Sequence, residues 1–367
     1  MKKSLLALAV LGAFTGAASA QSSVTLFGVV DLNARWVQNS GFSDRWTMNT
    51  DGINSSRLGF RGVEDLGGGL RAGFWLEAGV NADTGTTNAK FFNRRSTVSL
   101  LGNWGEVRLG RDYTPSFWNT TIFDPFGTNG VGSSLNVATG YLGANAVRYP
   151  TYVRSDNAFQ YFLPALGGLY GQITFAPGEG SGTGKYQGIR VGYAAGPFDV
   201  AIAYAIQNIG NGVPGFTNGY VPFTSNTSKG RLLNVAGSWD FGIVKLMGQY
   251  NQDQDSNADG RETRWLIGAT APLGQGELRA SYVGTQVRGQ SVGGVETNGD
   301  VSQFAIGYVY FLSKRTALYS NLAYLNNDGA AKLAIPGGPT TAGPAGFPAI
   351  NAGGSSTGIE AGIRPSF

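Results

Sequence analysis

The sequence of 367 residues contains no cysteine and no histidine. The absence of cysteine excludes a disulfide scaffold and thiol chemistry. The absence of histidine removes the most frequent general base and the most frequent metal-ligating side chain. No pair of carboxylates stands out as an acid and a base in a dry pocket either. We therefore expect a protein that is not an enzyme and that binds no cofactor.

Long apolar runs are also missing, since no stretch of eighteen apolar residues occurs in the chain and a membrane-spanning helix needs about 20. The first twenty residues carry Lys2 and Lys3, an apolar run, and small residues that end at Ala20. This is the pattern of a secretory signal peptide cleaved between Ala20 and Gln21. Its removal lowers the net charge from +4 to +2, a balance from which no partner can be argued. We expect no nucleic-acid partner.

What the chain does contain is a repeated alternation of apolar and polar residues. In the first row, Val24, Leu26 and Val30 alternate with Thr25 and Asp31, so one face of the strand is apolar and the other is polar. Such rows recur to the C-terminus, separated alternately by tight turns and long polar loops. Because the polar face carries charges, we expect an all-β fold, a transmembrane antiparallel β-barrel with lipid outside and water inside.

Following the turns predicts 16 strands and a single barrel domain over residues 21–367, with the short turns on the periplasmic side. A barrel of that size encloses an aqueous channel. A soluble all-β protein is the alternative, but soluble chains of this length usually divide into smaller domains.

The regular succession of strands is interrupted at residues 112–156, a segment far longer than a hairpin loop requires. It contains Phe117, Trp118 and Phe123, and aromatic residues argue against disorder. Long loops in compact proteins are usually functional. We therefore expect the third loop, 112–156, to fold into the lumen and narrow the pore; an exposed surface loop is the alternative.

Arginine supplies 19 of the 27 basic residues. Because Leu58 and Phe60 face lipid in the expected strand, Arg57 and Arg61 face the lumen. The same alternation places Arg95 and Arg108 inward. Arg154 also faces inward if its strand runs that far without a bulge.

Guanidinium groups stay charged at any accessible pH and bind carboxylate or phosphate through a planar fork. A narrow lumen lined with one sign of charge selects ions of the other sign, and the segment 112–156 offers few acidic residues to oppose the arginines, mainly Asp112 and Asp124. The alternative role for these arginines is pairing with Asp31, Glu77 and Glu106 as salt bridges of the wall. We expect both roles, in different arginines.

One loop has the spacing of a calcium ligand set. Asp253, Asp255, Asn257 and Asp259 alternate with other residues, as ligands do in an EF-hand loop. Ala258 stands where that loop needs glycine, and the flanking residues are typical of strands. The segment is a weak candidate for a calcium site, and a solvated loop is the default.

Six segments together carry a family likeness. They are SVTLFGVVD (23–31), SRLGFRGVEDLGGGL (56–70), RRSTVSL (94–100), GEVRLGR (105–111), LSKRTALY (312–319) and the closing GIR (362–364) with the terminal Phe367. The chain resembles the general diffusion porins of beta-proteobacterial outer membranes. The resemblance implies a sixteen-stranded homotrimer, embedded in outer-membrane lipid and lipopolysaccharide, whose third loop folds into the pore and which is often anion-selective.

The resemblance also implies roles for individual residues. The constriction arginines of the family fall on Arg57, on Arg94 or Arg95, and on Arg154. Alternation favours Arg95 over Arg94, and a bulge would reverse that choice. The terminal Phe367 matches the assembly signal of the family.

Two departures from the family pattern bear on these expectations. Pro365 lies in the last strand and cannot donate to the ladder, so we expect an interruption of its pairing with the first strand. The third loop lacks the acidic residues of the better known members.

We expect a passive channel of the outer membrane for small hydrophilic solutes and ions, with a preference for anions. A substrate-specific channel for organic acids or phosphate would use the same arginines. An adhesive or structural barrel that acts through its outer loops is the alternative outside transport.

Overall fold

The computed structural model consists almost entirely of antiparallel β-strands. It describes residues 23–138, 151–179, 184–208, 229–255, 261–288, 291–292, 295–296, 298–340 and 349–367. The expected signal peptide, 1–20 with its cleavage site Ala20-Gln21, lies outside these residues, as do Asn257 and Asp259 of the candidate calcium loop.

Nineteen strands form one sheet. In chain order they are β1 (Ser23–Val29), β2 (Leu32–Asn39), β3 (Arg45–Thr50), β4 (Arg57–Gly67), β5 (Leu70–Asn81), β6 (Thr86–Thr87), β7 (Arg95–Gly102), β8 (Gly105–Tyr113), β9 (Arg154–Phe162), β10 (Leu169–Ala176), β11 (Tyr186–Ala195), β12 (Phe198–Asn208), β13 (Lys229–Asp240), β14 (Lys245–Asp255), β15 (Arg261–Leu273), β16 (Gly276–Arg288), β19 (Gly299–Phe311), β20 (Thr316–Gly329) and β21 (Ser355–Pro365). A separate hairpin joins β17 (Ser291–Val292) and β18 (Val295–Glu296).

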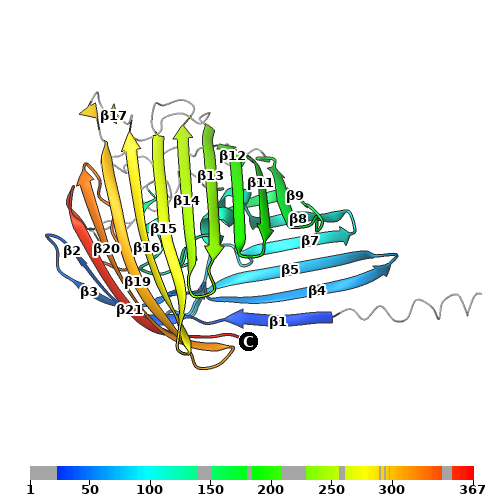
Figure 1. Cartoon of the computed structure of the whole chain (residues 1–367), viewed down its shortest axis with the longest axis horizontal. Helices are drawn as coiled ribbons and strands as arrows, with labels where there is room; N and C mark the ends of the chain where they lie inside the picture. Colours follow the sequence, from blue (N-terminus) through cyan, green and yellow to red (C-terminus); the bar gives the residue numbers. More distant parts are fainter. Residues whose placement is uncertain are drawn as a thin grey trace, which may run out of the picture.

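The sheet closes on itself (Figure 1), because β21 pairs with β20 on one side and with β2 on the other. At this seam the backbones of Gly28 and Phe367 exchange two hydrogen bonds of 2.9 and 3.0 Å. Val30 also donates its N–H to the carbonyl of Pro365 at 3.1 Å. The expected loss of pairing at Pro365 is therefore wrong: the register continues to Phe367, and the missing proline N–H is opposite Val30, where β1 and β2 separate.

The strand count exceeds the expected 16 for three visible reasons. Two residues, 30 and 31, separate β1 from β2, and six residues, 51–56, separate β3 from β4. The third is β6, a two-residue strand paired with the end of β5. The number of complete membrane crossings stays a prediction.

Alternation along the strands gives the barrel two different faces. In β12, Ala201, Ala203 and Ala205 are at most 3% exposed, whereas Ile202 and Tyr204 are 50% and 41% exposed. Leu58 and Phe60 are on the exposed face of β4, as the sequence predicted. Exposed apolar side chains around the ring form a surface suited to lipid.

In the segment between β8 and β9, the described residues 114–138 and 151–153 pack against the inner face and are called the inner loop below. It begins with α2 (Pro115–Ile122), where the Thr114 hydroxyl caps the helix by accepting the N–H of Phe117 at 3.4 Å and Pro115 takes the first turn. A 3₁₀ helix, η1 (Ser134–Val137), follows. Within the described part of the chain, neither the inner-loop helix nor any other is long and apolar enough to cross a membrane.

Apolar side chains of the inner loop fill the space beside β9–β20. Phe117 packs with Tyr186 and Leu232, and further along the loop Phe126 and Val131 belong to a cluster with inward residues of β15–β20. Buried apolar packing of this kind contributes roughly 1.5–3 kcal/mol for each large side chain. The loop is therefore part of the core of the protein.

A buried polar contact fixes the far end of the inner loop. The Arg264 guanidinium, 2% exposed, donates to the Tyr152 hydroxyl at 2.8 Å and pairs with Glu262 at 2.8 Å. Burial raises the pKa of Tyr152 to about 12, so its hydroxyl keeps its proton at neutral pH. The inner loop is thus anchored at both ends, by the helix cap at Thr114 and by Arg264 at Tyr152.

Replacement of Gly110 tests the close approach of β8 to β7. Gly110 has φ +122°, and a Cβ there would lie 2.1 Å from the carbonyl oxygen of Ser96 in β7. We expect Gly110→Ala to lower the free energy of unfolding by about 2 kcal/mol or more, measured as the urea midpoint in detergent micelles. The control is Gly248→Ala in β14, where the nearest atom is 3.9 Å away. Equal midpoints for the two variants would contradict this account.

Removal of the Tyr152 hydroxyl tests the anchor of the inner loop. Tyr152→Phe leaves the buried Arg264 without one hydrogen-bond partner, and a lost hydrogen bond to a charged group costs about 1.5–3 kcal/mol. We expect a lower thermal unfolding midpoint in detergent. Tyr324→Phe, a change of the same kind on the exposed face of β20, should leave the midpoint unchanged; a similar shift in both variants would argue against a specific anchor.

Candidate functional site

A cavity of about 650 Å³ lies between the inner loop and the wall formed by β2–β9. From the loop, Trp118, Thr121 and Asn129 line it. From the wall, it is lined by Arg35 of β2, Arg57 of β4, Arg94 before β7 and Arg154 of β9. Because the inner loop fills the opposite side of the barrel, open space remains along the arginine wall.

The charge on the cavity lining is strongly unbalanced. Of the described residues that line it, four are arginines and one, Asp51, is acidic. Like charges that converge on a narrow, partly desolvated space produce a potential that attracts the opposite sign. The cavity therefore favours anions.

Glu77 of β5 holds two of the arginines against the wall. Its Oε1 lies 2.5 Å from Nε of Arg94 and 3.3 Å from Nη1 of Arg57. Its Oε2 accepts the indole N–H of Trp75 at 3.0 Å. One carboxylate shared by two guanidinium groups leaves positive charge in excess.

Arg154 presents its charge to the cavity without an acidic partner. Its guanidinium carbon lies 4.2 Å from the centre of the Tyr113 ring, and its Nε donates to the carbonyl of Arg94 at 2.8 Å. No carboxylate within the described ranges forms an ion pair with it. The aromatic face and the carbonyl position the charge but do not neutralise it.

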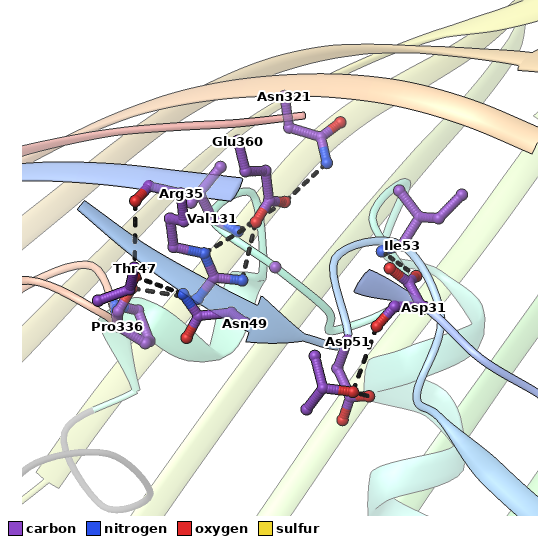
Figure 2. Close-up of polar contacts among 12 residues, drawn as sticks. Asp31, Arg35, Thr47, Asn49, Asp51, Ile53, Val131, Asn321, Pro336 and Glu360 are labelled. Atoms are coloured by element: carbon purple, nitrogen blue, oxygen red, sulfur yellow. Dashed lines mark hydrogen bonds and ion pairs between the residues drawn. The ribbon is translucent and has the colours of Figure 1, made fainter. Parts of the chain in front are cut away.

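Arg35 is a lining residue that the sequence argument did not single out, although Asp31 and Arg35 share the polar face of the first row. Its Nε and Nη2 pair with Glu360 of β21 at 2.9 and 2.8 Å, and its Nη1 donates to the carbonyl of Pro336 at 3.1 Å (Figure 2). Glu360 also accepts the backbone N–H of Val131 in the inner loop at 3.2 Å. This cluster joins the tip of the loop to the seam of the barrel.

Three other predicted arginines lie on the inner face away from the cavity lining. Arg108 pairs with Glu106 at 2.8 Å and with the buried Asp112 at 2.6 Å, and Arg95 lies 3.4 Å from Asp112. Arg61 is exposed, with its guanidinium carbon 5.1 Å from the Trp75 ring centre. Arg95 and Arg108 therefore form salt bridges of the wall, the alternative role considered above.

The two neighbours Arg94 and Arg95 differ in position because the strand begins between them. Arg95 is the first residue of β7 and pairs in register with Glu77. Arg94 precedes the strand, is free of its alternation, and lines the cavity. Arg154 also lies beyond an irregularity, because the β8–β9 register shifts between Gly110 and Asp112. Its predicted inward position required a strand without a bulge, and this requirement is not met.

Asp124 shapes the inner loop from within. Its buried carboxylate accepts backbone N–H groups from Phe126 at 2.8 Å, Thr128 at 3.1 Å and Ser134 at 3.0 Å. Burial raises the pKa of this carboxyl, while the three donors favour its ionised form. Asp124 is not among the residues that line the cavity.

The candidate calcium residues are only partly described. Asp253 lies in β14 and faces inward with 6% exposure, and Asp255 is the last residue of that strand. Over the described ranges, no group of three or more acidic side chains is placed to hold a metal ion. The calcium site stays a prediction, because two of its four residues lie outside those ranges.

Comparisons with known proteins agree with this architecture. The model of a family described as Gram-negative porin matches residues 7–330. Outer membrane porin protein 32 of Delftia acidovorans is 38% identical and is covered over the full length of both chains. A second relative, an outer membrane porin protein of Bordetella pertussis, is 31% identical over 89% of this chain and 95% of that protein.

A solved structure matches the barrel as a whole. The anion-selective porin from Comamonas acidovorans superposes with a TM-score of 0.80 and 35% identity, covering 95% of this chain and 100% of that chain. The family resemblance identified in the sequence is therefore confirmed. With the closed sheet, the inner loop and these relatives together, the chain belongs to the Gram-negative porin family.

Proposed function

We propose that this protein is a passive, anion-preferring channel of the outer membrane for small hydrophilic solutes and ions. One observation carries the proposal: the cavity beside the inner loop is lined by four arginines and a single aspartate. One relative, the anion-selective porin from Comamonas acidovorans, supports the same preference. As a member of a porin family the protein is a channel, which confirms the expectation that it is not an enzyme.

The arrangement of the lining supports a mechanism for ion preference. Because the inner loop packs against β9–β20 and touches the seam at Glu360, a solute has to pass along the arginine wall. Small anions gain contacts with Arg57, Arg94 and Arg154 that replace part of their hydration, while cations are repelled. Solutes larger than the remaining opening are excluded, so the inner loop acts as the size filter.

The assembly and location of the channel also belong to the proposal. The apolar outer face would contact outer-membrane lipid and lipopolysaccharide, after removal of the signal peptide 1–20. A homotrimer is supported by a solved structure of similar fold, OmpT of Vibrio cholerae in its trimer form, with a TM-score of 0.64 and 15% identity. The ring of Phe367 lies against Gly28 at the seam. Phe367 would serve as the assembly signal, because its docking completes the seam.

A substrate-specific channel for organic acids or phosphate is the second candidate. The guanidinium of Arg154, which has no carboxylate partner among the described residues, favours it, because a free planar fork binds carboxylate or phosphate in bidentate fashion. Conductance that saturates with one such solute would support this candidate, and conductance that rises in proportion to concentration would support general diffusion. A barrel with no conductance would favour an adhesive or structural role.

Removal of the uncompensated arginine tests the proposal. We expect Arg154→Ala to lower the anion-to-cation permeability ratio by about two- to tenfold, the effect of one charge beside a water-filled path. The ratio is measured as the reversal potential in a salt gradient across a planar lipid bilayer. Arg288→Ala is the control, because Arg288 pairs with Asp300 at the exposed end of β16, away from the cavity. An unchanged ratio in Arg154→Ala, or an equal change in the control, would refute the role of the arginine wall.

A further inference from the structure

The segment 51–56 leaves the barrel wall between β3 and β4. Leu32 pairs with Thr50 and Val29 pairs with Arg57, so six residues on one strand stand opposite two on its neighbour. A ladder cannot accommodate that difference, and the extra residues must bulge to one side. They bulge inward, because Asp51 and residues 53–56 line the same cavity as the arginines.

A buried carboxylate fixes this bulge to the wall. Oδ2 of Asp31 accepts the N–H group of Ile53 at 2.8 Å (Figure 2). The same oxygen accepts the N–H of Asn54 at 2.8 Å, and the Tyr319 hydroxyl donates to Oδ1. On its other side, the Ser55 hydroxyl donates to Oδ1 of Asn129 in the inner loop at 2.9 Å. The segment is therefore held between the wall and the inner loop, with a defined position beside the open space.

Asp51 occupies the start of the bulge in a conformation that suits few residues. Its φ is +68°, a region that asparagine and aspartate enter more readily than other side chains. Its Oδ1 accepts the N–H of Ser56 at 2.6 Å and the hydroxyl of Thr50 at 2.9 Å. Both donors are neutral, so they position the carboxylate without cancelling its charge.

The two carboxylates beside Arg94 differ in their partners. Glu77 forms ion pairs with Arg57 and Arg94. Asp51 forms no ion pair with any residue in the described part of the chain, although it is close enough to Arg94 to interact electrostatically. Its negative charge acts on whatever occupies the cavity.

We propose that Asp51 is a specificity-determining residue of the channel, which opposes the arginine field and limits the preference for small anions. The inference rests on the proposed function. It assigns to the bulge an acidic residue that the inner loop would otherwise have to supply. A channel conducts only if its ions bind weakly enough to leave. A carboxylate on the bulge weakens the hold of Arg57, Arg94 and Arg154 on an anion without changing the width of the opening.

The experiment compares Asp51→Asn with the wild type in a planar bilayer. Asparagine accepts the same hydrogen bonds and tolerates positive φ, so charge is removed with little change of shape. We expect the anion-to-cation permeability ratio to rise about two- to fivefold in roughly 0.1 M salt. The rise should shrink in roughly 1 M salt, where the screening length falls from about 10 Å to about 3 Å.

Two further variants serve as control and rescue. Asp240 accepts the N–H of Gly242 at 2.7 Å in a turn outside the cavity, so Asp240→Asn makes the same chemical change and should leave the ratio unchanged. Asn54 lies on the same bulge and lines the cavity. Adding Asn54→Asp to Asp51→Asn returns a carboxylate to the bulge and should bring the ratio back towards the wild-type value.

The outcomes separate this inference from the proposed function. A wild-type channel that prefers anions, together with an unchanged ratio in Asp51→Asn, overturns the role of Asp51 and leaves the proposed function in place. A change of equal size at both salt concentrations, with altered conductance in roughly 1 M salt, indicates a change of shape and also overturns it. A wild-type protein that forms no anion-preferring channel overturns both proposals.

Discussion

The structure depends on one constraint, the pairing of every backbone N–H and carbonyl group in a medium without water. A sheet can satisfy this requirement in hydrocarbon only by closing on itself. Here closure is made by β2 and β21 and is extended by the hydrogen bonds between Gly28 and Phe367. Once the sheet is closed, alternation divides the side chains between lipid and lumen, and a barrel of this width leaves a lumen too wide to be filled by side chains of the wall alone.

The same constraint explains where irregular backbone is tolerated. The two interruptions of the wall, residues 30–31 and 51–56, stand opposite each other, and the second lines the cavity, where polar partners are available. Asp31 supplies acceptors for the N–H groups of Ile53 and Asn54, and Ser56 supplies a hydroxyl for the N–H of Asp31 at 2.9 Å. Non-ladder backbone at membrane depth requires such partners or water. The polar residues at the seam of the barrel and the inward bulge therefore satisfy each other's backbone groups.

Alternation in the sequence predicted which face each side chain of a regular strand occupies. It predicted little about the irregular segments. It placed Leu58 and Phe60 on the outer face and Arg57 on the inner face correctly. A strand with lipid on one side and water on the other has apolar and polar residues in alternation. Alternation favoured Arg95 over Arg94, whereas Arg94 lines the cavity, because that choice depends on the residue at which β7 begins. Arg154 and Asp51 follow a register shift and a six-residue bulge, which depend on contacts between distant segments. The family resemblance implied Arg57, Arg94 or Arg95, and Arg154, and of these only Arg94 was not also indicated by alternation.

This division has a physical reason that bears on function. Side chains on regular strands stay near the wall, so a wide barrel built from strands alone has a wide, weakly selective lumen. Selectivity needs charges brought close to the path of the solute, and segments that leave the ladder add charges to those of Arg35 and Arg57 on the strands. The inner loop narrows the space from one side, and the bulge at 51–56 carries Asp51 into it from the other. Arg94 and Arg154 reach the same space from the ends of their strands, so the properties that distinguish this channel reside in its departures from regular alternation.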